Sequence, residues 1–286
     1  MAALLEREPI ARPIAKTPPS VEFRGIGQTF GQGGPNPYPA ISNLNLRVEP
    51  GEFMAIVGPS GCGKSSLLRI LAGLAPATAG EVLVDGRPVH GVDPSRIGFL
   101  FQQDALLPWR TVRDNVSLGL RFARRNGSTK QGDDRATRER VQEWIAKVGL
   151  SGFEERYPAQ LSGGMRKRVA LAQTLIGDPQ LLLMDEPFTA LDAQSRHLME
   201  NDLLALCGDG SKTILFVTHD LDEAAALADR IAIMTSGPSS RVKTVVDVGL
   251  PRPRDLLTVR DNPRFGEVTA VLWHQLYEEV RKVYGR

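Results

Sequence analysis

A glycine-rich segment near residue 60 has the residue types and the spacing that phosphate binding requires. The glycines of such a loop let successive backbone N–H groups surround an anion without a side chain in the way. Lys64 supplies a cation for the outer phosphates of a nucleotide, and the Ser65 hydroxyl can coordinate Mg²⁺. The pattern G-x-x-x-x-G-K-[ST] is matched at every required position, so we predict a P-loop that binds nucleotide phosphates. Its predicted binding residues are Gly58, Pro59, Ser60, Gly61, Cys62, Gly63, Lys64, Ser65 and Ser66.

Cys62 lies inside this loop and has two possible roles. A thiol at a helix N-terminus can have a low pKa and be reactive. The interpretation we favour is a small spacer whose backbone N–H matters more than its sulfur. The second cysteine, Cys207, lies in an apolar helical segment and is expected in the core. Two cysteines give no basis for a disulfide framework, which favours a reducing cytoplasm.

Two adjacent acids follow an apolar segment further along the chain. Residues 181–184 read Leu-Leu-Leu-Met, and Asp185 and Glu186 come next. In α/β folds, buried strands deliver their last residues to the carboxyl edge of the sheet, where ligands bind. One carboxylate can then hold Mg²⁺ through water while its neighbour acts on the attacking water. Helix capping is the alternative role for paired acids, but the P-loop upstream favours ATP hydrolysis.

Strands and helices alternate along most of the chain, which predicts an α/β core with a largely parallel sheet. A charged helical stretch at about 111–157 looks like an insert on that core, and 31–39 is an expected hairpin loop. The predicted strands cover 21–48 apart from that loop, 53–57, 81–84, 87–89, 97–101, 181–184, 213–217 and, as the last of the run, 231–234. The predicted helices cover 65–74, 165–176, a segment from 221, and 263–284, with Phe265, Val268, Leu272, Leu276 and Val280 on one face.

Composition narrows the class of protein. Lys and Arg total 35 and Asp and Glu total 33, so the net charge is +2 and gives no reason to expect nucleic acid as a partner. The local clusters at 121–125 and 166–168 are interpreted as solvated helix faces. We find neither a signal peptide nor a run of about 18 apolar residues that would span a membrane. A role at a membrane would therefore be exercised from outside the bilayer.

The segment Leu161-Ser162-Gly163-Gly164-Met165 resembles the signature sequence LSGGQ of the ABC ATPases. Physically it is a second helix start with bare N–H groups for an anion. Ser162 stands 23 residues before Asp185, and the resemblance extends from about residue 21 to residue 234. The other family motifs follow in the expected order. They are the aromatic A-loop position at Phe30, the Q-loop glutamine Gln102, the D-loop aspartate Asp192 and the switch histidine His219.

This resemblance implies a P-loop ABC ATPase core with an antiparallel β-subdomain and a helical insert at about 111–160. Residues 1–20 are rich in Pro and charged residues and are predicted to be a flexible tail. The ATPase domain is expected at 21–250 and a C-terminal helical extension at 251–286. The resemblance implies a head-to-tail homodimer in which each ATP lies between the P-loop of one copy and residues 162–164 of the other. The cofactors implied are ATP and Mg²⁺.

The resemblance also implies a role for each matched residue. Ser65, Gln102 and Asp185 would hold the metal, and Glu186 would polarise the attacking water. His219 would contact the γ-phosphate as the second catalytic residue. Gln102, Ser162, Gly163, Gly164 and Asp192 would bind the nucleotide together with the P-loop. Phe30 would stack on adenine, with nearby Tyr38 as the alternative.

Three further features resemble the importers for nitrate, aliphatic sulfonates and taurine. They are Met165 in place of the usual Gln, the stretch Ala105-Leu106-Leu107-Pro108-Trp109, and the stretch Pro251-Arg252-Pro253-Arg254-Asp255. The subgroup implies an ATP-hydrolysing subunit that works with integral membrane permease subunits and a separate substrate-binding protein. It would lie at the cytoplasmic face of the cell membrane as a peripheral subunit and drive uptake of a small anion.

Other classes of ABC protein fit less well. Soluble ABC proteins that act on ribosomes usually carry two cassettes, and DNA-repair ATPases contain long coiled coils. This chain has one set of motifs and no such coil. A lone cassette is compatible with an exporter subunit, and the subgroup resemblance argues for import instead. The intact Glu186 opposes a non-hydrolysing nucleotide-binding module.

Overall fold

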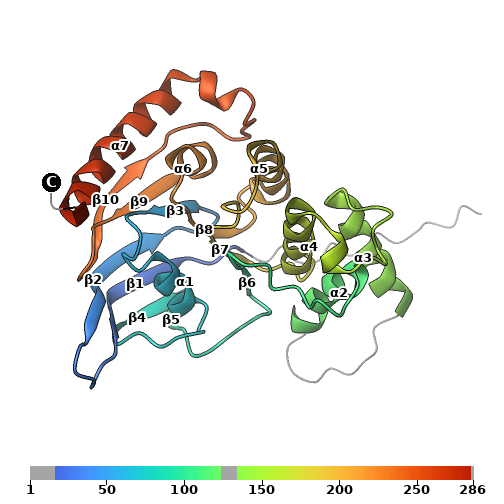
Figure 1. The fold of residues 1–286 in the computed structure, drawn as a ribbon, viewed down its shortest axis with the longest axis horizontal. Helices are drawn as coiled ribbons and strands as arrows, with labels where there is room; N and C mark the ends of the chain where they lie inside the picture. Colours follow the sequence, from blue (N-terminus) through green and yellow to red (C-terminus); the bar gives the residue numbers. More distant parts are fainter. Residues whose placement is uncertain (1–16, 124–133, 285–286) are drawn as a thin grey trace, which may run out of the picture.

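The structure is a computed structural model, and it describes residues 17–123 and 134–284. Most of the predicted N-terminal tail lies outside these residues, as do Arg124 and Arg125 of the basic cluster at 121–125. Within the described part, the chain forms a six-stranded sheet, a four-stranded sheet and a set of helices around them (Figure 1). The predicted α/β fold with an antiparallel β-subdomain and a helical insert is confirmed.

The six-stranded sheet forms the core, and its inner strands are buried along their whole length. Helices cover both faces of β3, β7 and β8. Every residue of these three strands is therefore buried, and nearly all are apolar, as expected for parallel strands. Neighbouring strands are parallel except at the β10 edge. From edge to edge the order is β10 (Val242–Asp247), β9 (Arg230–Met234), β3 (Phe53–Val57), β8 (Thr213–Val217), β7 (Leu181–Asp185) and β6 (Ile97–Leu100).

Strand β10 corrects one prediction, since we expected 231–234 to be the last strand. The chain instead turns after β9 and returns as β10, which pairs antiparallel with it. Five of the six residues of β10 are half-buried and the sixth is exposed, because the strand lies at the sheet edge. It therefore lacks the continuous apolar run that marks the inner strands.

The four-stranded antiparallel sheet lies beside the core and carries the predicted hairpins. Phe30 and Tyr38 are directly opposite each other across the first hairpin. The second hairpin turns at Asp85 and Gly86, both with positive φ, as the Asp-Gly signature requires. The strands in sheet order are β2 (Tyr38–Val48), β1 (Val21–Phe30), β4 (Ala79–Val84) and β5 (Arg87–Pro88).

Helices pack on the core sheet and also form the insert. Gly119 of α2 meets α4 so closely that a Cβ there would lie 1.9 Å from the carbonyl oxygen of Gln173. This contact fixes how the insert is attached. The helices are α1 (Lys64–Leu71), α2 (Val112–Ala123), α3 (Asp134–Lys147), α4 (Gly163–Leu175), α5 (Ala193–Cys207), α6 (Leu221–Leu227) and α7 (Pro263–Tyr284), with short 3₁₀ turns η1 (Pro158–Gln160) and η2 (Val259–Asp261). None of the helices described is long and apolar enough to cross a membrane.

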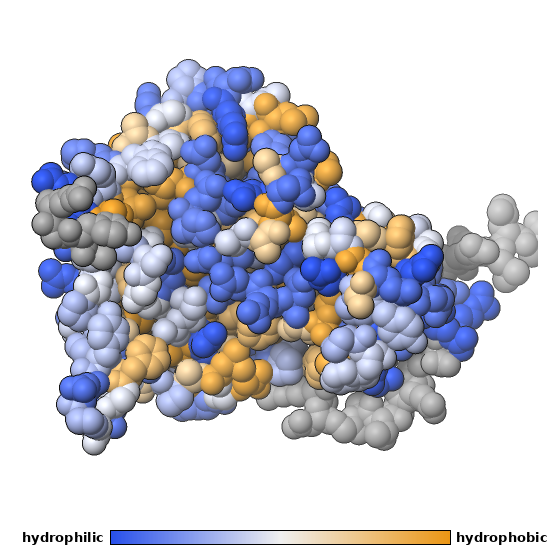
Figure 2. Space-filling view, in the orientation of Figure 1, coloured by the Kyte–Doolittle hydropathy of each residue, from blue (hydrophilic) through white to orange (hydrophobic). Residues whose placement is uncertain are grey.

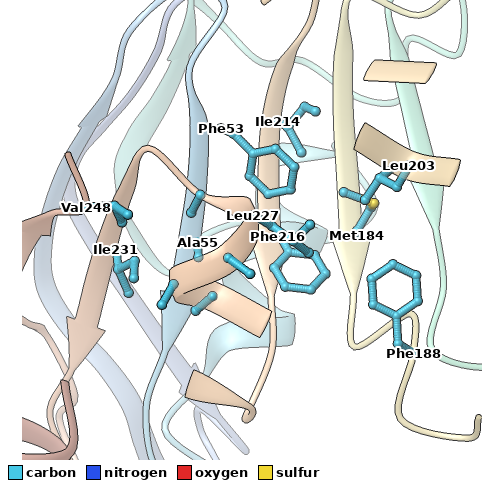
Figure 3. Close-up of a cluster of buried hydrophobic side chains, with 14 of the residues drawn as sticks. Phe53, Ala55, Met184, Phe188, Leu203, Ile214, Phe216, Leu227, Ile231 and Val248 are labelled. Atoms are coloured by element: carbon cyan, nitrogen blue, oxygen red, sulfur yellow. The ribbon is translucent and has the colours of Figure 1, made fainter. Parts of the chain in front are cut away.

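Aromatic packing between β3, β8 and the loop after β7 forms the centre of the core (Figure 3). The ring of Phe216 lies 5.9 Å from that of Phe53 and 5.8 Å from that of Phe188, centroid to centroid. Such aromatic pairs add about 0.5–1.5 kcal/mol each beyond the area that they bury. This packing holds together β3, which leads into the P-loop, β8, and the loop that follows the acid pair. It therefore positions the carboxyl edge of the core sheet.

The segment Pro251-Arg252-Pro253-Arg254-Asp255 is fastened to the core by Asp229. The Asp229 carboxylate accepts from Arg252 Nε at 3.0 Å and from an Arg254 amino group at 3.1 Å. Its other oxygen accepts the backbone N–H of Phe53, the first residue of β3, at 2.9 Å. Arg254 is almost fully buried at this contact. Asp229 therefore holds the segment to β3, the strand that leads into the P-loop.

Helix α7 continues from this segment and packs on the same core. Three of its five predicted apolar residues, Phe265, Val268 and Leu272, are buried. Leu276 packs partly against the core, and Val280 is half-buried. Over the face that Figure 2 draws, hydrophilic residues predominate and the apolar areas between them are small.

Asp229→Ala should lower the free energy of unfolding by about 3 kcal/mol, because it leaves the buried Arg254 guanidinium without a carboxylate. Urea unfolding at neutral pH measures the change. Asp247→Ala is the matched control, since Asp247 is mostly exposed and pairs with Arg230 at the surface. The control should cost under about 1 kcal/mol. Equal losses in the two variants would contradict a clamp at Asp229.

Candidate functional site

The P-loop joins β3 to α1 with the geometry that an anion site needs. Gly61 and Gly63 have φ of 78° and 96°, values that L side chains rarely adopt. A Cβ on Gly63 would also lie 2.6 Å from the side chain of Ile41, so this position needs glycine. Gly63 caps α1 without a side-chain hydrogen bond. The first N–H groups of the helix are therefore not satisfied by a side-chain cap.

Lys64 lies folded along the loop. Its Nζ donates to the carbonyl oxygens of Gly58 at 2.8 Å and Pro59 at 3.1 Å, and the side chain is buried. The cation is thus held at the loop by two neutral acceptors. Incoming phosphate oxygens would give it the charged partners that an ammonium prefers. The residues present fit a nucleotide polyphosphate.

Cys62 is packed under the loop rather than presented to solvent. It is fully buried, and burial raises the pKa of its thiol. Its sulfur lies against Gly58, where a Cβ would approach it to 2.9 Å. These observations favour the spacer role over the low-pKa thiol. Cys207 is buried in the core, also with burial raising its pKa, to about 12.

Ser65 and Asp185 meet at the end of β7. The Ser65 hydroxyl donates to Asp185 Oδ1 at 2.7 Å. Burial, followed by repulsion from Glu186, raises the pKa of Asp185, although the Ser65 hydrogen bond opposes this. A hydroxyl and a carboxylate side by side are hard oxygen ligands of the kind that Mg²⁺ prefers. The pair therefore fits Mg²⁺, whose charge would favour the ionised carboxylate.

Three other side chains meet the carboxylate of Glu186. Its Oε2 accepts from Gln102 Nε2 and from Thr189 Oγ1, both at 3.3 Å. His219 Nδ1 lies 3.3 Å from the same oxygen. The backbone of Glu186 has φ of 45°, in the left-handed region, while its N–H donates to Val217 O at 2.9 Å. Strained backbone of this kind is typical of functional sites.

Thr189 was missing from the sequence prediction. It follows Glu186 by three residues in the turn before Asp192, and nothing in its residue type or spacing distinguished it from any turn threonine. Within the described residues, the structure brings together the P-loop, Asp185, Glu186, Gln102 and His219.

Comparisons with known proteins agree with this geometry. A family model described as ABC transporter matches residues 41–189. An uncharacterised ABC transporter ATP-binding protein of Methanocaldococcus jannaschii is 47% identical over 85% of this chain and 86% of its own length. The nitrate import ATP-binding protein NrtD of Synechococcus elongatus is 39% identical over 90% of this chain and 91% of its own length.

A solved dimeric ATP-binding cassette in a post-hydrolysis state, bound to ADP and phosphate, superimposes with a TM-score of 0.70. It is 32% identical and covers 81% of this chain and 100% of its own. The chain belongs to the ABC transporter family. This ABC ATPase has the P-loop, acid pair and histidine of its site at one edge of the core sheet.

The remaining motifs of the ABC ATPase lie away from its P-loop. Ser162 caps α4, accepting the Met165 N–H at 3.3 Å, and Gly164 faces Ser195 at the start of α5. Asp192 caps α5, and hydrogen bonds from Ser195 and Gln194 lower its pKa. Figure 1 shows α4 beside the insert and α1 under the core sheet, in separate parts of the molecule.

Both aromatic candidates for the adenine lie at the open end of the first hairpin. Phe30 and Tyr38 are 49% and 44% exposed. The Tyr38 hydroxyl lies against Gly237, where a Cβ would come within 2.7 Å of it and 3.9 Å of the Gly61 carbonyl oxygen. Each ring is accessible enough to stack on a base, so both alternatives remain open.

A buried acidic cluster lies near His219. Thr218, which precedes His219, donates to Glu223 at 2.6 Å. Glu200 of α5 is almost fully buried, and burial, followed by repulsion from Glu223 and Asp220, raises its pKa to about 7. The folded state therefore binds a proton at Glu200 that the unfolded chain has already released above about pH 5. By linkage, this group makes the fold less stable as the pH rises from about 5 to 7.

Glu200→Gln should remove this pH dependence, because the amide resembles the protonated acid. At pH 8 the variant should be more stable than the wild type, by up to about 3 kcal/mol, and at pH 5 the two should match. Urea unfolding at both pH values measures the difference. Glu267→Gln, at an exposed position on α7, is the control and should leave the pH dependence unchanged. A Glu200→Gln effect of the same size at both pH values would contradict the titration.

Proposed function

We propose that this chain is the ATP-hydrolysing subunit of an importer for a small anion such as nitrate, an aliphatic sulfonate or taurine. The observation that supports ATP hydrolysis is that Gln102 and His219 both contact the Glu186 carboxylate, beside the P-loop. Similarity to a nitrate import ATP-binding protein over 90% of the chain supports import of an anion. Soluble ABC proteins acting on ribosomes or DNA, and exporter subunits, are the alternatives.

In this proposal ATP supplies the phosphoryl group, and Mg²⁺ neutralises charge on its phosphates. The P-loop residues, Gly58 to Ser66, bind the phosphates, with Lys64 contributing the cation. Ser65, Asp185 and Gln102 would hold the metal ion. Glu186 accepts a proton from the attacking water and orients it, and His219 contacts the γ-phosphate. Thr189 and Gln102 fix the Glu186 carboxylate at the carboxyl edge.

We further propose a head-to-tail homodimer. In Figure 1, α4, which begins at Gly163, lies apart from α1, which follows the P-loop. In this proposal a second copy brings the start of its α4 to the nucleotide. The likeness to a dimeric cassette bound to ADP and phosphate supports this arrangement. Asp192 then lies at the dimer interface. Phe30 stacks on adenine in our preferred assignment, and Tyr38 is the alternative.

The helical insert, at about 111–160, is proposed to dock on integral membrane permease subunits. A groove of about 250 Å³ separates α2 and α4 from β6, and Phe99, Phe101 and Phe122 line it. Its apolar wall suits a partner helix. A separate substrate-binding protein would deliver the solute, and this subunit would sit peripherally at the cytoplasmic face of the cell membrane. The net charge of +2 gives no support for a nucleic-acid partner.

We keep the domain division as part of this proposal. The tail covers 1–20, the ATPase domain 21–250 and the C-terminal helical extension 251–286. The ordered pairing of β1 to β10 within 21–250 supports the middle assignment.

Glu186→Gln should bind ATP normally but lose turnover by about 10²–10⁴-fold, because an amide accepts no proton from water. Phosphate release measures turnover, and size-exclusion chromatography with ATP should show an accumulated dimer. Glu267→Gln serves as the control for loss of a surface carboxylate and should hydrolyse ATP like the wild type. Wild-type turnover in Glu186→Gln would refute the assignment of the catalytic base.

Ser162→Arg should leave ATP binding to the isolated subunit intact and abolish the ATP-dependent dimer in a Glu186→Gln background. The added side chain would block the approach of the second copy. Met165→Gln is the matched control, because Met165 contributes only its backbone N–H to Ser162. This variant should still form the ATP-dependent dimer. If Ser162→Arg weakened ATP binding and dimerisation equally, the signature segment would have a structural role within one chain.

A further inference from the structure

Helix α7 contains a carboxylate that is buried on the side facing the strands. Glu279 is 1% exposed, while its neighbours on the helix include the half-exposed Glu278. An unpaired carboxylate in such a place would be strongly unfavourable. Glu279 is instead bonded at both oxygens. Oε2 accepts the backbone N–H of Ser236 at 3.0 Å and its hydroxyl at 3.3 Å, and Oε1 lies 2.6 Å from Lys282 Nζ and 3.3 Å from Lys243 Nζ.

This set of donors keeps Glu279 ionised. Burial by itself would raise its pKa, but the hydrogen bonds from Lys282, Ser236 and Lys243 outweigh burial and lower the pKa to about 2. The carboxylate therefore holds Ser236 with a charged acceptor throughout the physiological range, and such bonds are stronger than those between neutral groups.

Ser236 lies in the loop between β9 and β10, and residues 236–240 of this loop lie along the start of β2. Ser239 N–H donates to Pro39 O at 2.6 Å, and Ser240 N–H donates to Ala40 O at 3.0 Å. Ser42 N–H returns a bond to Ser240 O at 3.0 Å. The loop thus fixes the strand that begins at Tyr38, one of the two candidates for stacking on adenine.

The same loop also lies against the P-loop. Ser240 is fully buried, and it is close enough to the Cys62 thiol to oppose in part the rise in the pKa of that thiol. Met234, just before the loop, is so close to Gly58 that a Cβ there would come within 3.0 Å of the Met234 Cβ. Gly237 sits between the Tyr38 hydroxyl and the Gly61 carbonyl. Residues 236–240 therefore contact the phosphate side and the base side of the site at once.

We propose that Glu279 is a positioning residue for nucleotide binding, which fixes residues 236–240 between the P-loop and the start of β2. The proposal rests on the function proposed above, that these two segments bind ATP. Glu279 does not touch the nucleotide, and it acts through Ser236. Figure 1 shows the C-terminal end of α7 beside the end of β9 and the start of β10, where this connection is made. The C-terminal helix would thus tune the affinity of the site for ATP.

Glu279→Gln tests this in the full chain. The amide keeps the shape of the side chain but removes the charge that Lys243 and Lys282 neutralise. We expect KM and Kd for ATP to rise about fivefold or more, with kcat within about twofold of the wild type, since binding is lost without loss of chemistry. Hydrogen exchange at residues 236–240 and 40–42 should become faster. Glu278→Gln is the matched control, because Glu278 is the next residue along and also pairs with Lys243, at 2.6 Å, but is half-exposed.

Wild-type KM and Kd in Glu279→Gln would overturn the proposal, even if its thermal unfolding temperature fell, because Glu279 would then be a structural residue alone. If Glu279→Gln does not fold, Ser236→Ala carries the test by removing one donor. A raised KM for ATP supports the proposal, and an unchanged KM overturns it. Failure of the wild type itself to bind ATP would instead refute the proposed function, so the two failures are distinguishable.

Discussion

The pairing of β8 with both β3 and β7 is the constraint on which the site depends. Val217 is opposite Ile56 on one side and opposite Asp185 on the other. The three strands therefore end at one level, and the loops that follow them start together. Backbone bonds continue this alignment past the strands, since Glu186 N–H donates to Val217 O and Thr218 N–H donates to Ile56 O. A shift of one residue in either pair would separate the acid pair from the P-loop.

Polar groups at this edge satisfy one another in a way that ligands can replace. Lys64 is bonded to loop carbonyls, and Ser65 is bonded to Asp185. The acceptors of Lys64 are neutral carbonyl oxygens, so charged phosphate oxygens would be stronger partners for its ammonium group. A metal ion would likewise be a stronger partner for the Asp185 carboxylate than the neutral Ser65 hydroxyl is. These side chains are thus already held in place, and nucleotide and metal ion would exchange for these hydrogen bonds. Such preorganisation lowers the entropic cost of binding.

The sequence was most informative where local patterns specify the structure. The P-loop follows from glycine spacing, and β7 and β8 follow from continuous apolar runs between turns. Strand β10 was missed because an edge strand is half-buried and needs no such run. Two of the three partners of Glu279 could not be predicted either, since Ser236 and Lys243 are 43 and 36 residues away and only the folded chain brings them together. For the same reason, periodicity placed Val280 on the apolar face while the structure buries Glu279 beside it.

The C-terminal segment is joined to the nucleotide site by charge as well as by apolar packing. At its start, Asp229 ties Arg252 and Arg254 to the first residue of β3. Near its end, Glu279 ties α7 to the loop that follows β9. Between these two points, α7 buries its apolar face in the core shared with the inner strands. Because β3 leads into the P-loop and β9 leads into residues 236–240, both fastenings act on chain segments that enter the site. The proposed division at residue 250 therefore marks a change along the sequence, while the described residues on either side of it form one continuous core.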